Sequence, residues 1–312
     1  MPINSFIYPA NTLSQVTQKG IFAYGAMGAS HYSLSNIVSS SGVIASDVTG
    51  VGTARTYTYA TSYGGDKAIF GGGSVNLGTS VGTGVTNLVS NSGVISSDVT
   101  AVGTAKMGAA GAGYGGDKAI FAFGTTSNYL GVVSTSNLIS NSGVVSSDVT
   151  GVGTARYMLS AASYGEDKAI MAYGYTGGVQ NMSNLVSNSG VVASDTTGVG
   201  TARYSGAATS YGEDKAIFGF GYASGNLSLT NLVSNSGVVA SDTTGVGTAR
   251  TAPGASTYGG DKAIFAYGSN GFTGADLNYS NLVSNSGVVA SDVTGVGTGR
   301  TYLAAAGFSY SA

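Results

Sequence analysis

One phrase of seven residues occurs six times along the chain and constrains the fold more than any other feature. The phrase is Asn-(Leu/Ile)-(Val/Ile)-Ser-x-Ser-Gly, and successive copies begin 51, 50, 47, 47 and 50 residues apart. Residues 184–203 and 231–250 are identical throughout. A fixed period of about 50 residues indicates repeated units that each pack against their neighbours. The copies begin at Asn36, Asn87, Asn137, Asn184, Asn231 and Asn281.

Each repeat predicts four short β-strands. In the second copy, residues 55–63 alternate small and aromatic side chains, and residues 67–70 form a short apolar run. Residues 86–90 form a third strand, and a turn at residues 91–93 leads into a fourth strand at 94–95. Short runs between Gly, Asn, Asp and Ser residues are typical of strands and hairpins, and no segment has a sustained helical period. We therefore expect an all-β chain.

The ends of the chain favour a closed ring over an open solenoid. Residues 300–306 match residues 55–61, the opening strand of the second repeat, whereas the first repeat begins with a poor copy of that strand. A C-terminal strand that completes the first unit closes a ring, but a solenoid needs distinct polar caps. We predict a six-bladed β-propeller with four-stranded blades over residues 18–312. In it, residues 301–312 complete the first blade, and residues 1–17 form an N-terminal arm.

The repeat resembles the kelch repeat. An apolar strand that ends in Gly is followed by a variable loop, another strand, a tight turn and a closing Arg, and Val-Gly-Thr-Ala-Arg lies where kelch units carry a Pro-x-x-Arg phrase. The chain lacks the kelch tryptophan, and most units lack the full Gly-Gly doublet that is present at residues 71–72. Nearly identical units rich in Ser, Thr and Gly also resemble virion proteins of tailed phages. The resemblance implies a propeller fold and a place in a tail, a fibre or a capsid decoration.

The charged side chains follow the repeat. They make up 8% of the chain, against about 25% in an ordinary soluble domain, and all 12 basic residues recur at fixed positions. Because one substrate needs one nucleophile and one base, charges copied around a ring imply a shared structural task. We expect recurring acidic and basic residues to brace the connection between blades with charge-assisted hydrogen bonds, and a symmetric ring of ion sites is the alternative. They are Asp47, Asp98, Asp148, Asp195, Asp242 and Asp292 with Arg55, Lys106, Arg156, Arg203, Arg250 and Arg300.

The sequence contains no recognisable catalytic apparatus. Cysteine is absent and His31 is the only histidine, so we expect neither a metal nor a cofactor and interpret His31 as a loop residue. The phrase Gly-Val-Gly-Thr at residues 50–53 lacks the Lys-Ser/Thr ending and the helix of a phosphate loop, which indicates a turn. A hydrolase that acts on polysaccharide would need paired carboxylates, and Asp276 beside a repeat Asp is the only asymmetric option. We therefore predict that the protein is not an enzyme.

The sequence also limits the compartment and the partners. A formal net charge of −2 gives no basic footprint for nucleic acid, and no run approaches the roughly 18 apolar residues of a membrane span. The first nine residues have neither the basic region nor the apolar core of a secretion signal. We expect assembly in a host cytoplasm and a final location in a virion, without nucleic-acid binding or membrane insertion.

The copies diverge mainly in the loop between the second and third predicted strands. Because successive strands reverse direction, this loop is expected on the same face as the connection between blades. Binding residues concentrate on loops held by rigid scaffolds, and aromatic side chains offer rigid contact area, although relaxed constraint explains the divergence equally well. The aromatic residues there are Tyr32, Tyr129, Tyr175, Tyr222, Phe272 and Tyr279.

These features favour a non-enzymatic structural and binding protein of a phage particle. It would present its variable face to other virion proteins or to a glycan or protein of the host surface. A soluble glycan-binding lectin is the second interpretation, and a polysaccharide hydrolase is the third. The arm at residues 1–17 could reach a neighbouring subunit and form a homo-oligomer.

Overall fold

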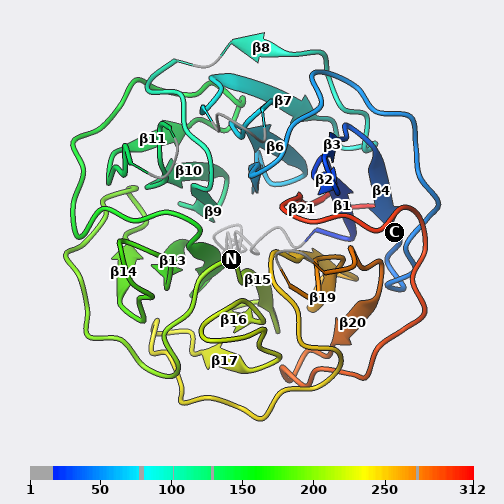
Figure 1. Ribbon diagram of the computed structural model, residues 1–312. Helices are drawn as coiled ribbons and strands as arrows, with labels where there is room; N and C mark the ends of the chain where they lie inside the picture. Colours follow the sequence, from blue (N-terminus) through cyan, green and yellow to red (C-terminus); the bar gives the residue numbers. More distant parts are fainter. Residues whose placement is uncertain (1–16, 77–80, 101, 128–129, 272–273) are drawn as a thin grey trace, which may run out of the picture.

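The computed structural model describes residues 17–76, 81–100, 102–127, 130–271 and 274–312, and the predicted all-β class is confirmed there. These residues form β-strands and no helix. Six antiparallel sheets of three or four strands stand around a common centre in a β-propeller-like arrangement (Figure 1). The predicted arm at residues 1–17 falls almost entirely outside the described residues.

We number the sheets by repeat. Sheets 2 to 6 each use consecutive strands, whereas sheet 1 combines the last strand of the chain with β1 and β4. A separate hairpin, β2 (Ala26–Met27) and β3 (Ser30–His31), follows β1. The sheets are β21 (Ala304–Phe308), β1 (Lys19–Ala23) and β4 (Ser35–Val38); β5 (Tyr59–Tyr63), β6 (Lys67–Gly71), β7 (Val85–Val89) and β8 (Val99–Thr100); β9 (Ala110–Tyr114), β10 (Lys118–Ala122) and β11 (Ser136–Ile139); β12 (Ser160–Tyr164), β13 (Lys168–Ala172) and β14 (Ser183–Val186); β15 (Ala207–Tyr211), β16 (Lys215–Gly219) and β17 (Thr230–Val233); β18 (Gly254–Tyr258), β19 (Lys262–Ala266) and β20 (Ser280–Val283).

The middle strand of each sheet is an apolar run because both of its faces are covered. In β10, Ala119, Ile120, Phe121 and Ala122 are all buried after an exposed Lys118. The first strand of a sheet alternates buried and half-exposed residues, a period of two that matches a strand with one covered face. The repeated Lys-Ala-Ile-Phe phrase is therefore the centre of each sheet.

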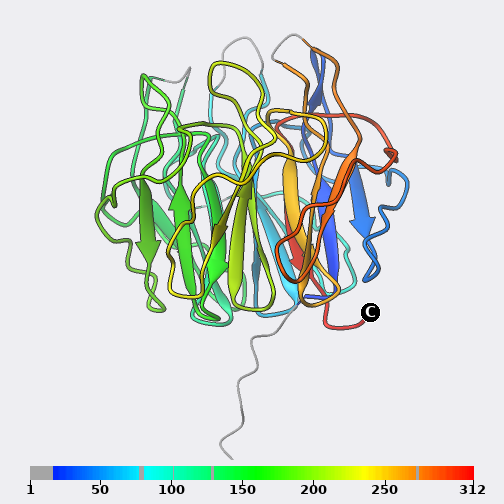
Figure 2. The same ribbon diagram turned by 90° about the horizontal axis from the view of Figure 1, so that it is seen from below.

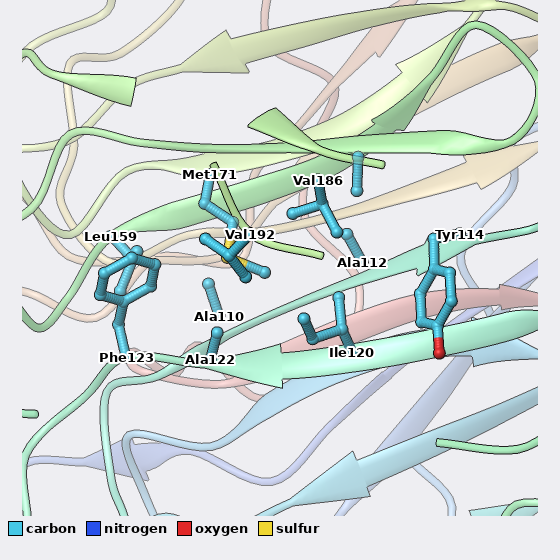
Figure 3. Packing of buried hydrophobic residues seen from close by; sticks show 11 residues of the cluster. Ala110, Ala112, Tyr114, Ile120, Ala122, Phe123, Leu159, Met171, Val186 and Val192 are labelled. Atoms are coloured by element: carbon cyan, nitrogen blue, oxygen red, sulfur yellow. The ribbon is translucent and has the colours of Figure 1, made fainter. Parts of the chain in front are cut away.

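The hydrophobic core is divided into six clusters, one between each pair of neighbouring sheets. Figure 3 shows the cluster between sheets 3 and 4, where Ile120 and Ala122 face Met171 and Val186. The cluster between sheets 6 and 1 contains Phe22 and joins residues from the two ends of the chain. Burial of apolar surface contributes about 25 cal/mol per Å². In this fold it therefore stabilises the packing of each sheet against the next.

The first strands of the sheets surround a central cavity of about 160 Å³ that is lined mainly by Ala, Gly, Ser and Thr. Each first strand packs against the first strands of both neighbouring sheets. At one mouth of the cavity, backbone hydrogen bonds of 2.7–3.3 Å link neighbouring sheets in a series that returns to its first residue. The donors and acceptors are Tyr57 N to Tyr302 O, Gly108 N to Tyr57 O, Met158 N to Gly108 O, Ser205 N to Met158 O, Ala252 N to Ser205 O and Tyr302 N to Ala252 O.

The two ends of the chain meet in sheet 1. β21 pairs antiparallel with β1 from Lys19 opposite Phe308 to Ala23 opposite Ala304. Gln18 N donates to Ser309 O at 2.7 Å, and Ser309 N donates to Asp66 O of sheet 2 at 2.8 Å. The C-terminal segment therefore pairs with the first repeat, as the sequence match predicts.

The prediction of four regular strands in every blade is wrong in detail. Only sheet 2 has a named fourth strand, β8, and elsewhere the outer segment pairs through isolated bridges such as Val38–Ile44 and Ser35–Val48. Between these two bridges, β4 spans three residue steps and the outer segment spans four. The outer segment therefore contains one extra residue, as in a β-bulge. The side-chain amide of Asn36 donates to Ala45 O at 3.0 Å within this irregular stretch.

Candidate functional site

The buried Arg55 connects sheets 1 and 2. Its guanidinium donates to Asn87 Oδ1 at 2.5 Å, to Gly72 O at 2.8 Å and to Thr53 O at 3.2 Å. It also lies 4.0 Å from the ring centroid of Tyr24, close enough for a cation–π contact. The side chain is completely buried, and a buried charge is tolerated when hydrogen bonds satisfy it, as they do here.

Asp98 completes this arrangement, which we call the clamp. Its carboxylate accepts hydrogen bonds from Thr53 N at 3.0 Å, from Thr53 Oγ1 at 2.5 Å and from Asn87 Nδ2 at 2.8 Å. Burial opposes ionisation, but these hydrogen bonds outweigh it, so the pKa of Asp98 lies below its usual value. Gly52 has a positive φ of 77°, and a Cβ there would collide with the carboxylate. The Gly-Val-Gly-Thr turn therefore binds an anionic group of its own chain.

The same clamp occurs in every repeat. The acidic and basic residues predicted to act together do lie together, but the Arg–Asp nitrogen-to-oxygen distances are 3.7–3.9 Å, and Asn and Thr make the direct hydrogen bonds. In the sequence, the repeated Asn served only to align the repeats, and no role in the clamp was predicted for it. The clamps contain Asp47 with Arg300, Asp98 with Arg55, Asp148 with Lys106, Asp195 with Arg156, Asp242 with Arg203, and Asp292 with Arg250.

Lys106 is the exception among the basic residues of the clamps. Its ammonium donates to Asn137 Oδ1 at 2.9 Å and to Thr135 O at 3.3 Å. Burial lowers the pKa of Lys106 to about 8. The preceding repeat has Gly72 where the other repeats have the aromatic residue that stacks on the clamp arginine. The ring of Tyr59 lies where a side chain at Gly72 would point.

The loops between the second and third strands lie on one side of the molecule, and the short turns and the C-terminus lie on the other (Figure 2). We call the loop side the variable face. Residues that enter each first strand pair with the start of the following loop, for example Thr56 with Ser74 and Tyr157 with Tyr175. The connection between sheets and the variable loop therefore share a face.

On the variable face, the buried Tyr157 and the half-buried Tyr175, Tyr204 and Tyr222 form what we call the tyrosine row. Their ring centroids are 5.8, 5.2 and 5.8 Å apart in this order, and each pair meets edge to face. Two bridges, Tyr157–Tyr175 and Tyr204–Tyr222, place the rings side by side within sheets 4 and 5. The 5.2 Å contact joins the two sheets.

Of the four predicted loop aromatics that the structure describes, it brings two, Tyr175 and Tyr222, into this row. Tyr32 is half-buried in the first repeat, and Tyr279 is 37% exposed in the last. Tyr129 and Phe272 lie outside the described residues. Tyr157 and Tyr204 were missed because they directly follow the clamp arginine and were counted with the first strand. The available signal was that only repeats 4 and 5 have Tyr at that position.

Among the described residues, Asp276 has neither His31 nor a repeat Asp as a hydrogen-bond partner. Asp276 accepts a hydrogen bond from Gly28 N at 2.9 Å, and burial raises the pKa of its carboxyl group. His31 lies in β3, burial lowers its pKa, and its Nε2 atom is buried without a hydrogen-bond partner. The Asp276–Gly28 contact joins the variable loops of the last and first repeats.

The described segments contain neither clustered metal ligands nor a membrane-spanning helix. No group of three or more His, Cys, Asp or Glu side chains there is placed to hold a metal ion. None of the described residues forms a helix with the length and hydropathy needed to cross a membrane. Neither a comparison with protein-family models nor a search among curated proteins finds a match for the chain.

Proposed function

We propose that the chain is a six-bladed β-propeller that its C-terminal strand closes. The series of hydrogen bonds from Tyr57 through Tyr302 supports this proposal because it has neither a first nor a last member. The antiparallel pairing of β21 with β1 and the clamp of Asp47 with Thr298 support it as well, since both join the ends of the chain. Thr298 Oγ1 lies 2.6 Å from Asp47 Oδ2, and the equivalent distances in the other repeats are 2.5–2.6 Å.

We further propose that the protein is a non-enzymatic structural and binding component of a virus particle. The observation that carries this proposal is that the recurring charged side chains bind groups of their own chain, whereas the side chains of the variable face differ between repeats. The recurring acids and bases of the clamps are engaged with their own chain, and four of the lysines that open a second strand, such as Lys67, pair with the Asp before them, whereas the repeats differ from each other on the variable face. A rigid scaffold with one divergent face suits recognition more than turnover.

The particle part of the proposal depends on the resemblance of these repeats to virion proteins of tailed phages. In such a particle the variable face would contact host-surface molecules or other virion proteins. A chain with 8% charged residues and six inter-sheet hydrophobic layers suits a component that must stay folded without a ligand.

Mass spectrometry of purified particles tests this function. Particles would be purified on a density gradient from a culture infected with the phage whose genome encodes the chain. We expect its peptides to sediment with the major capsid protein at a constant ratio after washes with salt and detergent. Peptides found only in the soluble fraction of the lysate would contradict a structural role in the particle.

A further inference from the structure

The tyrosine row occurs in only two of the repeats, and the backbone pairing that all repeats share does not require it. At the two paired positions occupied by Tyr204 and Tyr222, repeat 2 has Thr56 and Ser74, and these small residues form the same bridge. An aromatic ring is therefore not needed to form the pairing. Two adjacent repeats nevertheless both carry it, which produces one continuous row rather than isolated rings.

The loops of the two repeats that carry the row are polar but uncharged, and the neighbouring Arg156 and Arg203 are buried in their clamps. Residues 173–183 and 220–230, the loops of these two repeats, contain no Asp, Glu, Lys, Arg or His. They contain Gln180, Asn181 and Asn226, whose amides can both donate and accept hydrogen bonds. A site of this kind offers no favourable charge pairing to an anionic or a cationic ligand.

One polar atom near the row has no partner. Asn226 pairs with Tyr222 through a backbone bridge, and its Oδ1 atom is buried without a hydrogen bond. A buried acceptor without a donor costs about 1 to 3 kcal/mol, so it favours a ligand or water that supplies one. A ligand hydroxyl would satisfy it.

We infer that the tyrosine row binds a neutral carbohydrate chain. The negative face of an aromatic ring attracts the C–H bonds on the apolar face of a sugar ring, and amide groups bond to its hydroxyls. Because the row extends across sheets 4 and 5, it suits an oligosaccharide more than a single sugar. This inference rests on the proposed role of the variable face in binding and names the class of ligand.

Affinity electrophoresis of the full chain tests the inference. Native gels would contain dextran, soluble starch, a mixed-linkage β-glucan or galactomannan as neutral polymers, and alginate as an anionic polymer. The test variant is Tyr204→Thr with Tyr222→Ser, which installs the residues that repeat 2 has at these positions. The control is Tyr302→Ala, which changes a tyrosine at the cavity mouth to the residue that repeat 6 has there.

We expect at least one neutral polymer to retard the wild type and the Tyr302→Ala control equally. The double variant should bind at least tenfold more weakly while its thermal unfolding temperature stays unchanged. Should the double variant fold poorly, Tyr204→Phe with Tyr222→Phe retains the rings and should bind within about threefold of the wild type.

Three results would overturn the inference: no retardation of the wild type by any neutral polymer, equal retardation of a folded double variant, or retardation by alginate alone. Particle membership is measured separately by mass spectrometry. A protein that is present in particles but binds no neutral polymer refutes the inference alone, and a protein that binds but is absent from particles refutes the proposed function.

Discussion

At the scale of single residues, repeat 2 and the clamp that follows it contain three linked departures from the pattern. Gly72 replaces the aromatic residue of the other repeats, Tyr59 replaces a small residue of the first strand, and Lys106 replaces arginine. The ring of Tyr59 is buried, lies 4.7 Å from that of Phe121 and fills the space beside Gly72. The ring of Tyr59 in β5 thus fills the space beside Gly72 in place of the missing aromatic side chain. The clamp lacks the ring at position 72 on which the cation of Lys106 would stack.

Gly72→Phe should be strongly coupled to Tyr59→Ala. Alone, Gly72→Phe forces a ring into the space of Tyr59 and should lower the free energy of unfolding by about 1 to 3 kcal/mol, whereas Tyr59→Ala leaves a cavity. In the double variant the new ring occupies the vacated space, so the loss should be smaller than the sum of the single losses by at least about 1 kcal/mol. Urea unfolding of the four proteins measures the coupling.

A matched cycle provides the control for this coupling. Tyr59→Ala combined with Phe220→Leu, which lies in another sheet, should be additive within about 0.5 kcal/mol. Additivity of the Gly72 and Tyr59 changes would show that the two side chains do not share one space.

Because the pKa of Lys106 is lowered, we predict that the free energy of unfolding rises with pH. Its folded pKa is about 8 and the usual value is 10.5, so between these values the unfolded chain binds more protons and the folded state gains stability as pH rises. Relative to Lys106→Met, which cannot titrate, the wild type should gain about 1.5 kcal/mol of unfolding free energy between pH 8 and 9.5. Urea unfolding at several pH values measures the difference, and a constant difference would contradict the depressed pKa.

At the scale of elements, the clamp replaces part of a regular fourth strand. In sheet 1, Asn36 donates to Ala45 O at 3.0 Å and to Asp47, and it accepts from Arg300, so one side chain connects the third strand, the outer segment and the incoming connection. The outer segment can therefore be held while only isolated bridges pair it with the sheet. The repeated turn supplies the backbone amide of Thr298 to the same carboxylate.

Asp98→Asn should destabilise the protein at neutral pH by about 1 to 3 kcal/mol, because an amide in place of the carboxylate loses charge-assisted bonds from Thr53 and Asn87. The folded pKa of Asp98 is lowered, so its contribution is present above the usual value of 3.8 and is lost as pH falls through the lower folded pKa. The difference from the wild type should therefore shrink as pH falls below 3.8.

Thermal unfolding between pH 2.5 and 7 measures this effect. Val94→Ser, which changes an exposed side chain of the same repeat, is the control and should alter stability by less than about 0.5 kcal/mol. An Asp98→Asn loss that stays constant with pH would contradict the role of the ionised carboxylate.

At the scale of the whole molecule, sheet 1 combines the first and the last described strands, β1 and β21. Of the clusters that flank sheet 1, one contains Phe308 of β21 and the other has Ala305 of β21 packed against it. A single strand therefore contributes to two of the six hydrophobic layers. Stability should be cooperative around the proposed propeller rather than additive along a stack.

Deletion of residues 301–312 should abolish the cooperative thermal transition or lower its midpoint by more than about 10 °C, since it removes β21 and exposes apolar surface of both neighbouring clusters. A synthetic peptide of residues 300–312 should restore the transition when added in excess. Deletion of residues 311–312 alone is the control and should have little effect. A truncated chain that melts like the wild type would contradict closure through β21.

The sequence alone predicted the all-β class and the limits of the repeated unit because period, turn residues and apolar runs are local properties. It also predicted that the recurring charges act together, since copied charges need copied partners. It could not predict that Asn87 lies between Arg55 and Asp98, because a bulged strand shifts register by one residue and only the folded chain fixes that shift.

Only the tertiary structure could show the tyrosine row. Tyr175 and Tyr204 are 29 positions apart in the sequence and belong to different repeats, yet their ring centroids lie 5.2 Å apart. The local sequence pattern determines the strands and turns of each repeat, because each of these elements depends on its own residues. Which side chains meet between repeats was decided by the packing of sheet on sheet, which no single repeat contains.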